Sequence, residues 1–328
     1  ISYLWFGAMG MGAYCGQTGS DGERFKVLDN AYELGCTFWD TPDVYGDSEE
    51  IIGKWYLNPE KRSKIFLTKF RIIVSGSDGR DVDGSPKYVH ESFAKSPRLL
   101  GVDKIDIYYL HRPDHQTPIE VRLCMKLSSS LERQGKVKYL GLSECTVDTL
   151  RRAHKVHPIA TVQVGHSPFT LGTEDSKLNI LNTARELGIK IIAYSPLGRG
   201  LITRQYKFSD DFETNDFRGM IPRYAKEDFP NILKLADDLT RVGEQYNATA
   251  GQVALAWLLP QGEDVIPIPG TKVKYLEENL GAVNVSLSPE SVQEVRVIAK
   301  KADWVVGDRY PPAAMKALYA ETPLPRST

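Results

Sequence analysis

Eight short segments rich in Val, Ile, Phe and Tyr alternate along this chain with stretches of helical period. These segments are almost continuously apolar, which is typical of parallel strands buried on both faces of a sheet. Strands that alternate with crossover helices indicate an α/β fold, and eight such units in 328 residues favour a closed (β/α)₈ TIM barrel. We expect a single domain over residues 1–328, with strands at residues 4–6, 37–40, 65–69, 104–110, 137–142, 160–164, 190–194 and 265–267.

Capping residues mark several of the intervening helices. Residues 20–23, Ser-Asp-Gly-Glu, form a capping box, and Gly35 follows the amphipathic stretch that it opens. Ser85 and Pro86 supply an N-cap and a first-turn proline after the third strand. A further helix is predicted over residues 175–187, where a glycine follows.

Three stretches interrupt this rhythm. Pro97 falls inside an outer helix, so we expect that helix to end or kink near Lys95. Residues 198–229 follow the seventh strand without a clear period, and loops of this length often cover a site. The tail at residues 304–328 is rich in proline and aromatic residues, and we expect it near the mouth of the barrel.

The charge balance excludes some classes of function. Lys plus Arg (41) nearly equal Asp plus Glu (42), without long runs of one sign, so neither a nucleic-acid nor a membrane partner is indicated. The four cysteines are far apart without a CxxC spacing, which favours a reducing, cytoplasmic setting. The acidic segment 76–84 lacks the closing Glu of a calcium loop, so no metal site is expected. With these classes set aside, a small molecule is the expected partner. The sequence does not indicate an oligomeric state.

Four polar residues stand where predicted strands end. Asp40 and Tyr45 lie in FWDTPDVYG, Lys69 in IFLTKF and His111 in IDIYYLHRP. The carboxyl ends of barrel strands share one mouth, so these residues are predicted to converge there. Tyrosine has a pKa of about 10, and a nearby ammonium such as Lys69 would stabilise its anion. The group is a candidate proton-transfer site.

Taken singly, each of these residues has an ordinary explanation. Asp40 before Thr-Pro could initiate a turn, His111 could be a structural histidine, and Tyr45 could be a loop aromatic. Lys69 closes an apolar strand and requires a carboxylate, for which Asp40 is the nearest candidate in the pattern. The four ordinary explanations would all have to apply at once, and we therefore favour a shared site.

These four residues, in this order and context, resemble the catalytic Asp, Tyr, Lys and His of the aldo-keto reductase superfamily. The resemblance extends from GAMGMG in the first strand to PGTKVKYLEEN after the eighth, and is nearest to plant and fungal NADPH-dependent aldehyde and ketone reductases. It implies hydride transfer from NADPH to a carbonyl carbon, with Tyr45 as the proton donor. Lys69 and Asp40 would tune the tyrosine, and His111 would position the carbonyl oxygen.

The resemblance also implies the residues that bind NADPH/NADP+. Ser143, Glu144 and Gln163 would hold the nicotinamide carboxamide. Tyr194 would stack on the nicotinamide ring. Backbone near the diphosphate would come from Ser195, Leu197, Gly198 and Gly200.

The segment after the eighth strand completes the implied cofactor site. It opens a helix with Gly270, Thr271, Lys272 and Lys274, and a helix start flanked by lysines suits a 2′-phosphate. Glu278 and Asn279 in the same helix would contact adenine. Lysines at a helix start are otherwise usually solvated.

Two points qualify the resemblance. Gly165 and His166 stand where many relatives carry Glu-Tyr, which would give the nicotinamide pocket a different shape and a second titratable group. Some members of this superfamily act instead as cofactor-bound regulatory subunits of membrane channels, with the same four residues and little turnover. The alternative function is therefore a regulatory subunit.

Overall fold

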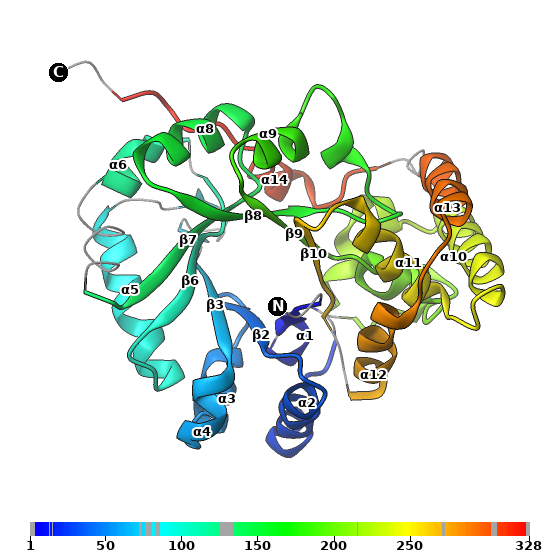
Figure 1. Cartoon of the computed structure of the whole chain (residues 1–328), viewed down its shortest axis with the longest axis horizontal. Helices are drawn as coiled ribbons and strands as arrows, with labels where there is room; N and C mark the ends of the chain where they lie inside the picture. Colours follow the sequence, from blue (N-terminus) through cyan, green and yellow to red (C-terminus); the bar gives the residue numbers. More distant parts are fainter. Residues whose placement is uncertain are drawn as a thin grey trace.

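The chain forms a barrel of eight parallel strands surrounded by helices (Figure 1). The computed structural model describes residues 4–12, 14, 16–71, 74–75, 81–82, 86–113, 115–124, 134–214, 216–270, 273–302 and 307–325. The barrel strands are β1 (Phe6–Gly7), β2 (Phe38–Pro42), β3 (Phe66–Arg71), β6 (Ile105–Leu110), β7 (Val137–Ser143), β8 (Ile159–Gly165), β9 (Lys190–Tyr194) and β10 (Val265–Ile268). All eight strands predicted from the sequence are confirmed.

The sheet closes on itself between its first and last strands. The strands pair in the order of the chain from β1 to β10. The amides of Trp5 and Gly7 donate to the carbonyl oxygens of Pro267 and Pro269 at 3.0 and 3.1 Å. Closure leaves no free edge, so the carboxyl ends of all eight strands surround one mouth, as in other TIM barrels.

Helices connect the strands and cover the outside of the barrel (Figure 1). They are α1 (Met9–Gly12), α2 (Asp21–Glu33), α3 (Ser48–Trp55), α4 (Pro59–Lys64), α5 (Pro86–Leu100), α6 (Ile119–Cys124), α8 (Val147–Val156), α9 (Ile180–Glu186), α10 (Phe229–Glu244), α11 (Ala250–Leu258), α12 (Val273–Gly281), α13 (Pro289–Ala302) and α14 (Pro312–Met315). A two-stranded hairpin, β4 (Val74–Ser75) with β5 (Asp81–Val82), lies outside the barrel sheet. Among the described residues, no helix has the length and apolar character needed to cross a bilayer.

Local sequence signals explain most of the helix boundaries. Ser20 accepts from the Glu23 amide and the Glu23 side chain accepts from the Ser20 amide, so the predicted capping box is present at the start of α2. Gly35 follows with φ +75°, a conformation that glycine adopts without strain. The loop over residues 198–229 consists of short 3₁₀ turns, η2 (Gly198–Thr203), η3 (Ser209–Asp211), η4 (Phe217–Met220) and η5 (Pro222–Tyr224).

Two helices extend differently from the sequence prediction. Helix α5 continues through Pro97 to Leu100. Pro97 lies in the last turn, where its missing amide removes a single helical hydrogen bond, and the fully buried Leu100 anchors that turn in the core. Helix α9 begins only at Ile180, because Asp175 accepts from the Lys177 amide in a turn and Asn179 is left-handed with φ 48°.

The core has an inner and an outer part. Inside the barrel, side chains from several strands pack together, namely Trp5, Ile107, Tyr109, Ile192, Ile266 and Ile268, with Phe38, Phe66 and Tyr194 against them. The outer core fills the space between strands and helices, and includes Trp39 and Trp55 on one side and Trp257 on the other. A packed interior excludes a central pore through the barrel.

Close packing of α3 against α5 gives a test of this arrangement. A Cβ added at Gly53 of α3 would lie 2.1 Å from the carbonyl oxygen of Leu99. Because backbone on both sides has no freedom to move, we expect Gly53→Ala to destabilise the fold by about 2–4 kcal/mol. Thermal or urea unfolding measures the change. The control is Gly22→Ala in α2, where nothing lies within 4 Å and a change of less than about 1 kcal/mol is expected. Equal effects of the two substitutions would contradict this packing.

Candidate active site

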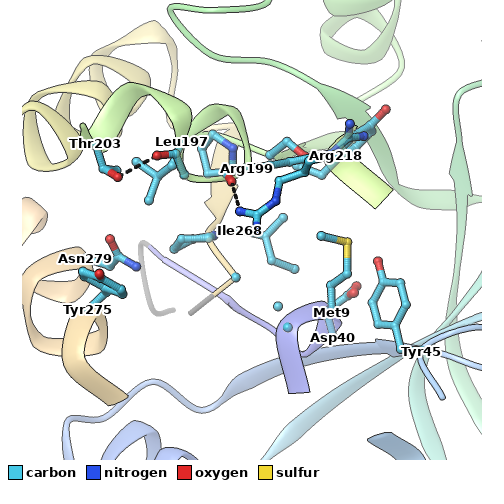
Figure 2. Close-up of a pocket in the computed structure, with 18 of the residues that line it drawn as sticks. Met9, Asp40, Tyr45, Leu197, Arg199, Thr203, Arg218, Ile268, Tyr275 and Asn279 are labelled. Carbon is cyan, nitrogen blue, oxygen red and sulfur yellow. Dashed lines mark hydrogen bonds between the residues drawn. The ribbon is translucent and has the colours of Figure 1, made fainter. Parts of the chain in front are cut away.

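A cavity opens at the carboxyl ends of the barrel strands (Figure 2). Its volume, with the open mouth included, is about 1270 Å³. Residues predicted from the sequence that line it are Asp40, Tyr45, His111, Gln163, Tyr194, Ser195, Leu197, Gly200, Gly270, Glu278 and Asn279. Lys69, Ser143, Glu144 and Gly198 are not among its lining residues and lie behind the wall. The cavity therefore brings together most of the predicted site.

Asp40 lies on β2 and is buried at the base of the cavity. Its Oδ2 accepts from Thr68 Oγ1 at 2.7 Å and from Gln163 Nε2 at 3.4 Å. Burial raises the pKa of Asp40 to about 7, although these hydrogen bonds and the charge of Lys69 act in the opposite direction. At neutral pH this carboxyl group is divided between its charged and neutral forms.

Lys69 on β3 is fully buried, and its ion pair is with Glu49. Lys69 Nζ lies 2.8 Å from Glu49 Oε2, in the first turn of α3. Glu49, which the sequence pattern did not indicate, is therefore a carboxylate partner of Lys69, and the charge of Lys69 also acts on the Asp40 carboxyl group. Glu49 was missed because a Glu at a helix start ordinarily faces solvent, and nothing in the local sequence indicates that this one is buried.

Tyr45 is placed by a tight contact between two loops. A Cβ at Gly12 would lie 1.8 Å from the Tyr45 carbonyl oxygen, and one at Gly46 would lie 2.3 Å from the Gly12 oxygen. Only glycine allows this backbone approach, which fixes the loop that carries Tyr45. The ring of Tyr14 packs edge-on against the Tyr45 ring, with centroids 5.9 Å apart.

The phenol of Tyr45 is a neutral group. Burial and the charge of Asp40 raise the pKa of Tyr45 well above 10, and Arg112 is the cation that acts to lower it. The sequence pattern predicts Lys69 as the cation that stabilises the Tyr45 anion. A tyrosine in this state holds its proton at neutral pH and has one to give when charge develops on a substrate oxygen.

His111 follows β6 directly and is neutral as well. Burial lowers the pKa of His111 well below 6.5, and the charges of Arg112 and Lys69 act in the same direction. Arg112 Nη1 donates to the His111 carbonyl oxygen at 2.9 Å and to Ser143 Oγ at 3.0 Å. Arg112 thus fixes the strand end that carries the histidine, and its guanidinium lines the cavity.

The three residues predicted to hold a carboxamide take different positions. Gln163 faces the cavity and Ser143 lies behind Arg112. Glu144 is fully buried and turned outward, where Oε1 accepts from the Gly165 amide at 3.0 Å and Oε2 pairs with Arg309 at 3.3 Å. In this structure Glu144 holds the tail and does not face the cavity.

The loop after β9 lines the cavity with backbone in unusual conformations. Ser195, Arg199 and Gly200 have φ values of 50°, 57° and 93°. Such left-handed positions are uncommon outside glycine and are concentrated at functional sites. Gly198 instead packs outward, where an added Cβ would lie 3.1 Å from Phe169.

Residues near the eighth strand form the opposite end of the cavity. Asn279 and Tyr275 lie at one side of the close-up and Tyr45 at the other (Figure 2). Glu278 accepts from Thr249 Oγ1 at 2.6 Å. Thr271 and Lys272 are outside the described residues, and only the backbone of Lys274 is described.

Several lining residues could not be predicted from the sequence. Arg218 pairs with Asp216, stacks on Tyr206 at 4.4 Å, and donates from Nη1 to the Arg199 carbonyl oxygen at 3.0 Å. Other unpredicted lining residues are Met9, Gly10, Pro196, Thr203, Gln205, Ile268, Pro269 and Tyr310. The irregular loop over residues 198–229 has no period, so the sequence carries no signal for which of its side chains face inward.

The C-terminal tail lies at the barrel mouth, as predicted. Tyr310 Oη donates to Tyr194 Oη at 3.3 Å, and the Arg199 guanidinium lies 4.5 Å from the Tyr310 ring centroid. Farther along, the Ala320 amide donates to the Glu144 carbonyl oxygen at 3.1 Å. The tail therefore contributes to the wall of the cavity.

The structure places Gly165 and His166 in different surroundings. His166 does not face the cavity; it packs edge-on against Trp257 and hydrogen-bonds Thr173 through Nδ1 at 3.1 Å. It is therefore not a titratable group beside Tyr194. Gly165 leaves room for Arg309, whose Nη1 lies 2.2 Å from where a Cβ at this position would be.

The contact between Gly165 and Arg309 predicts that a side chain at position 165 will loosen the C-terminal tail. Gly165→Ala must displace the Arg309 guanidinium and so weaken its pairing with Glu144. We expect hydrogen exchange of backbone amides at residues 307–320 to accelerate by roughly tenfold. Gly172→Ala is the control, because nothing lies within 4 Å of that site. Unchanged exchange in Gly165→Ala would show that Arg309 does not fasten the tail.

Comparisons with known proteins show which sequences and folds this chain resembles. The aldo/keto reductase family model matches residues 4–300. The chain is 52% identical over 330 residues to aldo-keto reductase str7 of Strobilurus tenacellus, covering 98% of this chain and 95% of that protein. It is 44% identical over 328 residues to aldo-keto reductase yakc [NADP(+)] of Schizosaccharomyces pombe, with 98% and 95% covered. The glycerol dehydrogenase AKR11B4 of Gluconobacter oxydans superposes with a TM-score of 0.79 at 26% identity, over 92% of this chain and 93% of that one.

Proposed function

Because the chain belongs to the aldo/keto reductase family, we propose that it reduces aldehydes or ketones to alcohols by hydride transfer from NADPH. The observation that carries the proposal is that Asp40, Tyr45 and His111 line one cavity, with Lys69 buried on the strand that pairs with that of Asp40. The name of the Schizosaccharomyces pombe relative, which includes NADP(+), supports the cofactor.

The shape and chemistry of the cavity fit a dinucleotide. It extends from Asn279 at one end to Tyr45 at the other (Figure 2). Between them, Arg199 offers positive charge suited to a diphosphate, whereas the charge of Arg218 is paired with Asp216. Asn279 Nδ2 is buried and has no hydrogen-bond partner among the described residues, so a ring nitrogen of adenine would satisfy it. Tyr194 would face the nicotinamide ring.

Each residue near Tyr45 has a distinct part in the proton transfer. When bound, NADPH supplies the hydride. Tyr45 Oη, which holds its proton at neutral pH, donates it to the carbonyl oxygen as negative charge develops there. Neutral His111 hydrogen-bonds the same oxygen and orients it. Arg112 stabilises the tyrosinate that remains.

The proton-donor assignment is tested by Tyr45→Phe. Removing Oη deletes the donated proton while the ring and loop remain, so we expect kcat for aldehyde reduction to fall by at least about 100-fold. NADPH binding, followed by its fluorescence, should change little. Tyr14→Phe, which removes a hydroxyl from the neighbouring ring, is the control and should retain turnover.

Two outcomes would count against the proposal. Unchanged turnover in Tyr45→Phe would remove Tyr45 as the donor. If the wild-type protein binds NADPH tightly but turns over no member of a panel of aromatic and aliphatic aldehydes and ketones, the regulatory-subunit alternative is favoured.

The lysines after β10 predict the choice of cofactor. Lys272 and Lys274 precede or begin α12, where a 2′-phosphate would meet both lysines and the helix start. Charge-assisted contacts of this kind are worth about 1.5–3 kcal/mol, so the double alanine variant should raise KM for NADPH by roughly 10- to 100-fold. KM for NADH, which lacks that phosphate, serves as the internal control. Comparable kcat/KM for NADPH and NADH in the wild type would refute the preference.

A further inference from the structure

Glu49 is a buried carboxylate beside the proposed proton-transfer group. It is the second residue of α3, four positions after Tyr45. Its side chain is 6% exposed, and Oε2 lies 2.8 Å from Nζ of Lys69, whose side chain is 0% exposed. The pair joins the helix after the Tyr45 loop to the strand beside Asp40.

The start of α3 is held firmly in this position. Ser48 Oγ and Thr41 Oγ1 are 2.8 Å apart and both are buried, which fastens the helix to β2. One turn later, Gly53 allows the helix to approach the backbone of α5. The Glu49 carboxylate is therefore delivered to Lys69 by packed elements on both sides and not by a mobile loop.

The Glu49 carboxylate has no other function that the structure reveals. Its Oε1 is buried and has no hydrogen-bond partner among the described residues. The Asp40 carboxylate differs, because its Oδ2 accepts from Thr68 and Gln163. A buried ion pair usually contributes no more stability than apolar residues of similar size would, so its presence here calls for a reason other than stability.

The electrostatics around Lys69 supply that reason. The ionisable groups that interact with it include Glu49 from α3, Asp40 from β2 and His111 after β6. Asp40 is only partly ionised near neutral pH, since its pKa is about 7. Glu49 is the carboxylate in contact with Lys69 Nζ, and the Lys69 charge in turn acts on Asp40 and His111, which line the same cavity as Tyr45.

We propose that Glu49 is a positioning residue for the proton transfer, holding Lys69 in place and keeping it charged between Asp40 and His111. The inference rests on the proposed function. Glu49 does not touch the cavity and would act only through the lysine.

The test is Glu49→Gln, which keeps shape and removes charge. A buried ammonium without its carboxylate gives up its proton more readily, so kcat for aldehyde reduction should fall by at least about tenfold and decline on the alkaline side about one pH unit earlier than in the wild type. KM for the aldehyde and for NADPH should change little, because the cavity wall is intact. Glu49→Asp should recover part of kcat. Glu50→Gln, on the next and exposed residue, is the matched control and should resemble the wild type.

A second background keeps the test decisive if Glu49→Gln loses stability. The Lys69→Met variant lacks the ammonium group through which Glu49 would act, so adding Glu49→Gln to it should lower kcat no further. Melting temperatures should show that the single and double variants are both folded. An equal loss in either background would overturn the proposal, as would wild-type kcat and pH profile in Glu49→Gln. A wild-type protein without turnover would overturn the proposed function and this inference together. Wild-type turnover with an unaffected Glu49→Gln would overturn only the inference.

Discussion

Closure of the parallel sheet is the constraint on which the rest of the structure depends. Backbone hydrogen bonds from Trp5 and Gly7 to the strand after α11 join the first and last strands. Because every strand runs the same way, closure brings residues as distant in sequence as Asp40 and Tyr194 to one mouth. The packed barrel interior leaves the mouth as the place where side chains from all of these strands meet.

Burial then determines the protonation states at that mouth. It raises the pKa of Tyr45, lowers that of His111, and brings that of Asp40 to about 7. Two hydrogen-bonding groups are thus neutral where a carbonyl oxygen would sit, and the fixed positive charges belong to Lys69 and Arg112. Environments that shift the pKa values of neighbouring groups in opposite directions are typical of sites that transfer protons near neutral pH.

Local patterns predicted the fold and the central residues because their causes are local. Buried strands are continuous apolar runs, and the capping box of Ser20 needs only four residues. Glu49, Arg309 and Arg218 could not be predicted, since their roles depend on contacts with residues distant in sequence or within an aperiodic loop. The same limit applies at Pro97, where α5 continues because tertiary packing of Leu100 outweighs one lost hydrogen bond.

A crystal structure of the protein with NADP+ tests most directly whether this mouth is where hydride and proton meet. We expect the nicotinamide ring against Tyr194, its C4 atom facing the space between Tyr45 and His111, and the adenine near Asn279. A nicotinamide bound elsewhere, or one whose C4 leaves no place for a carbonyl oxygen within hydrogen-bond reach of Tyr45 Oη, would contradict this arrangement.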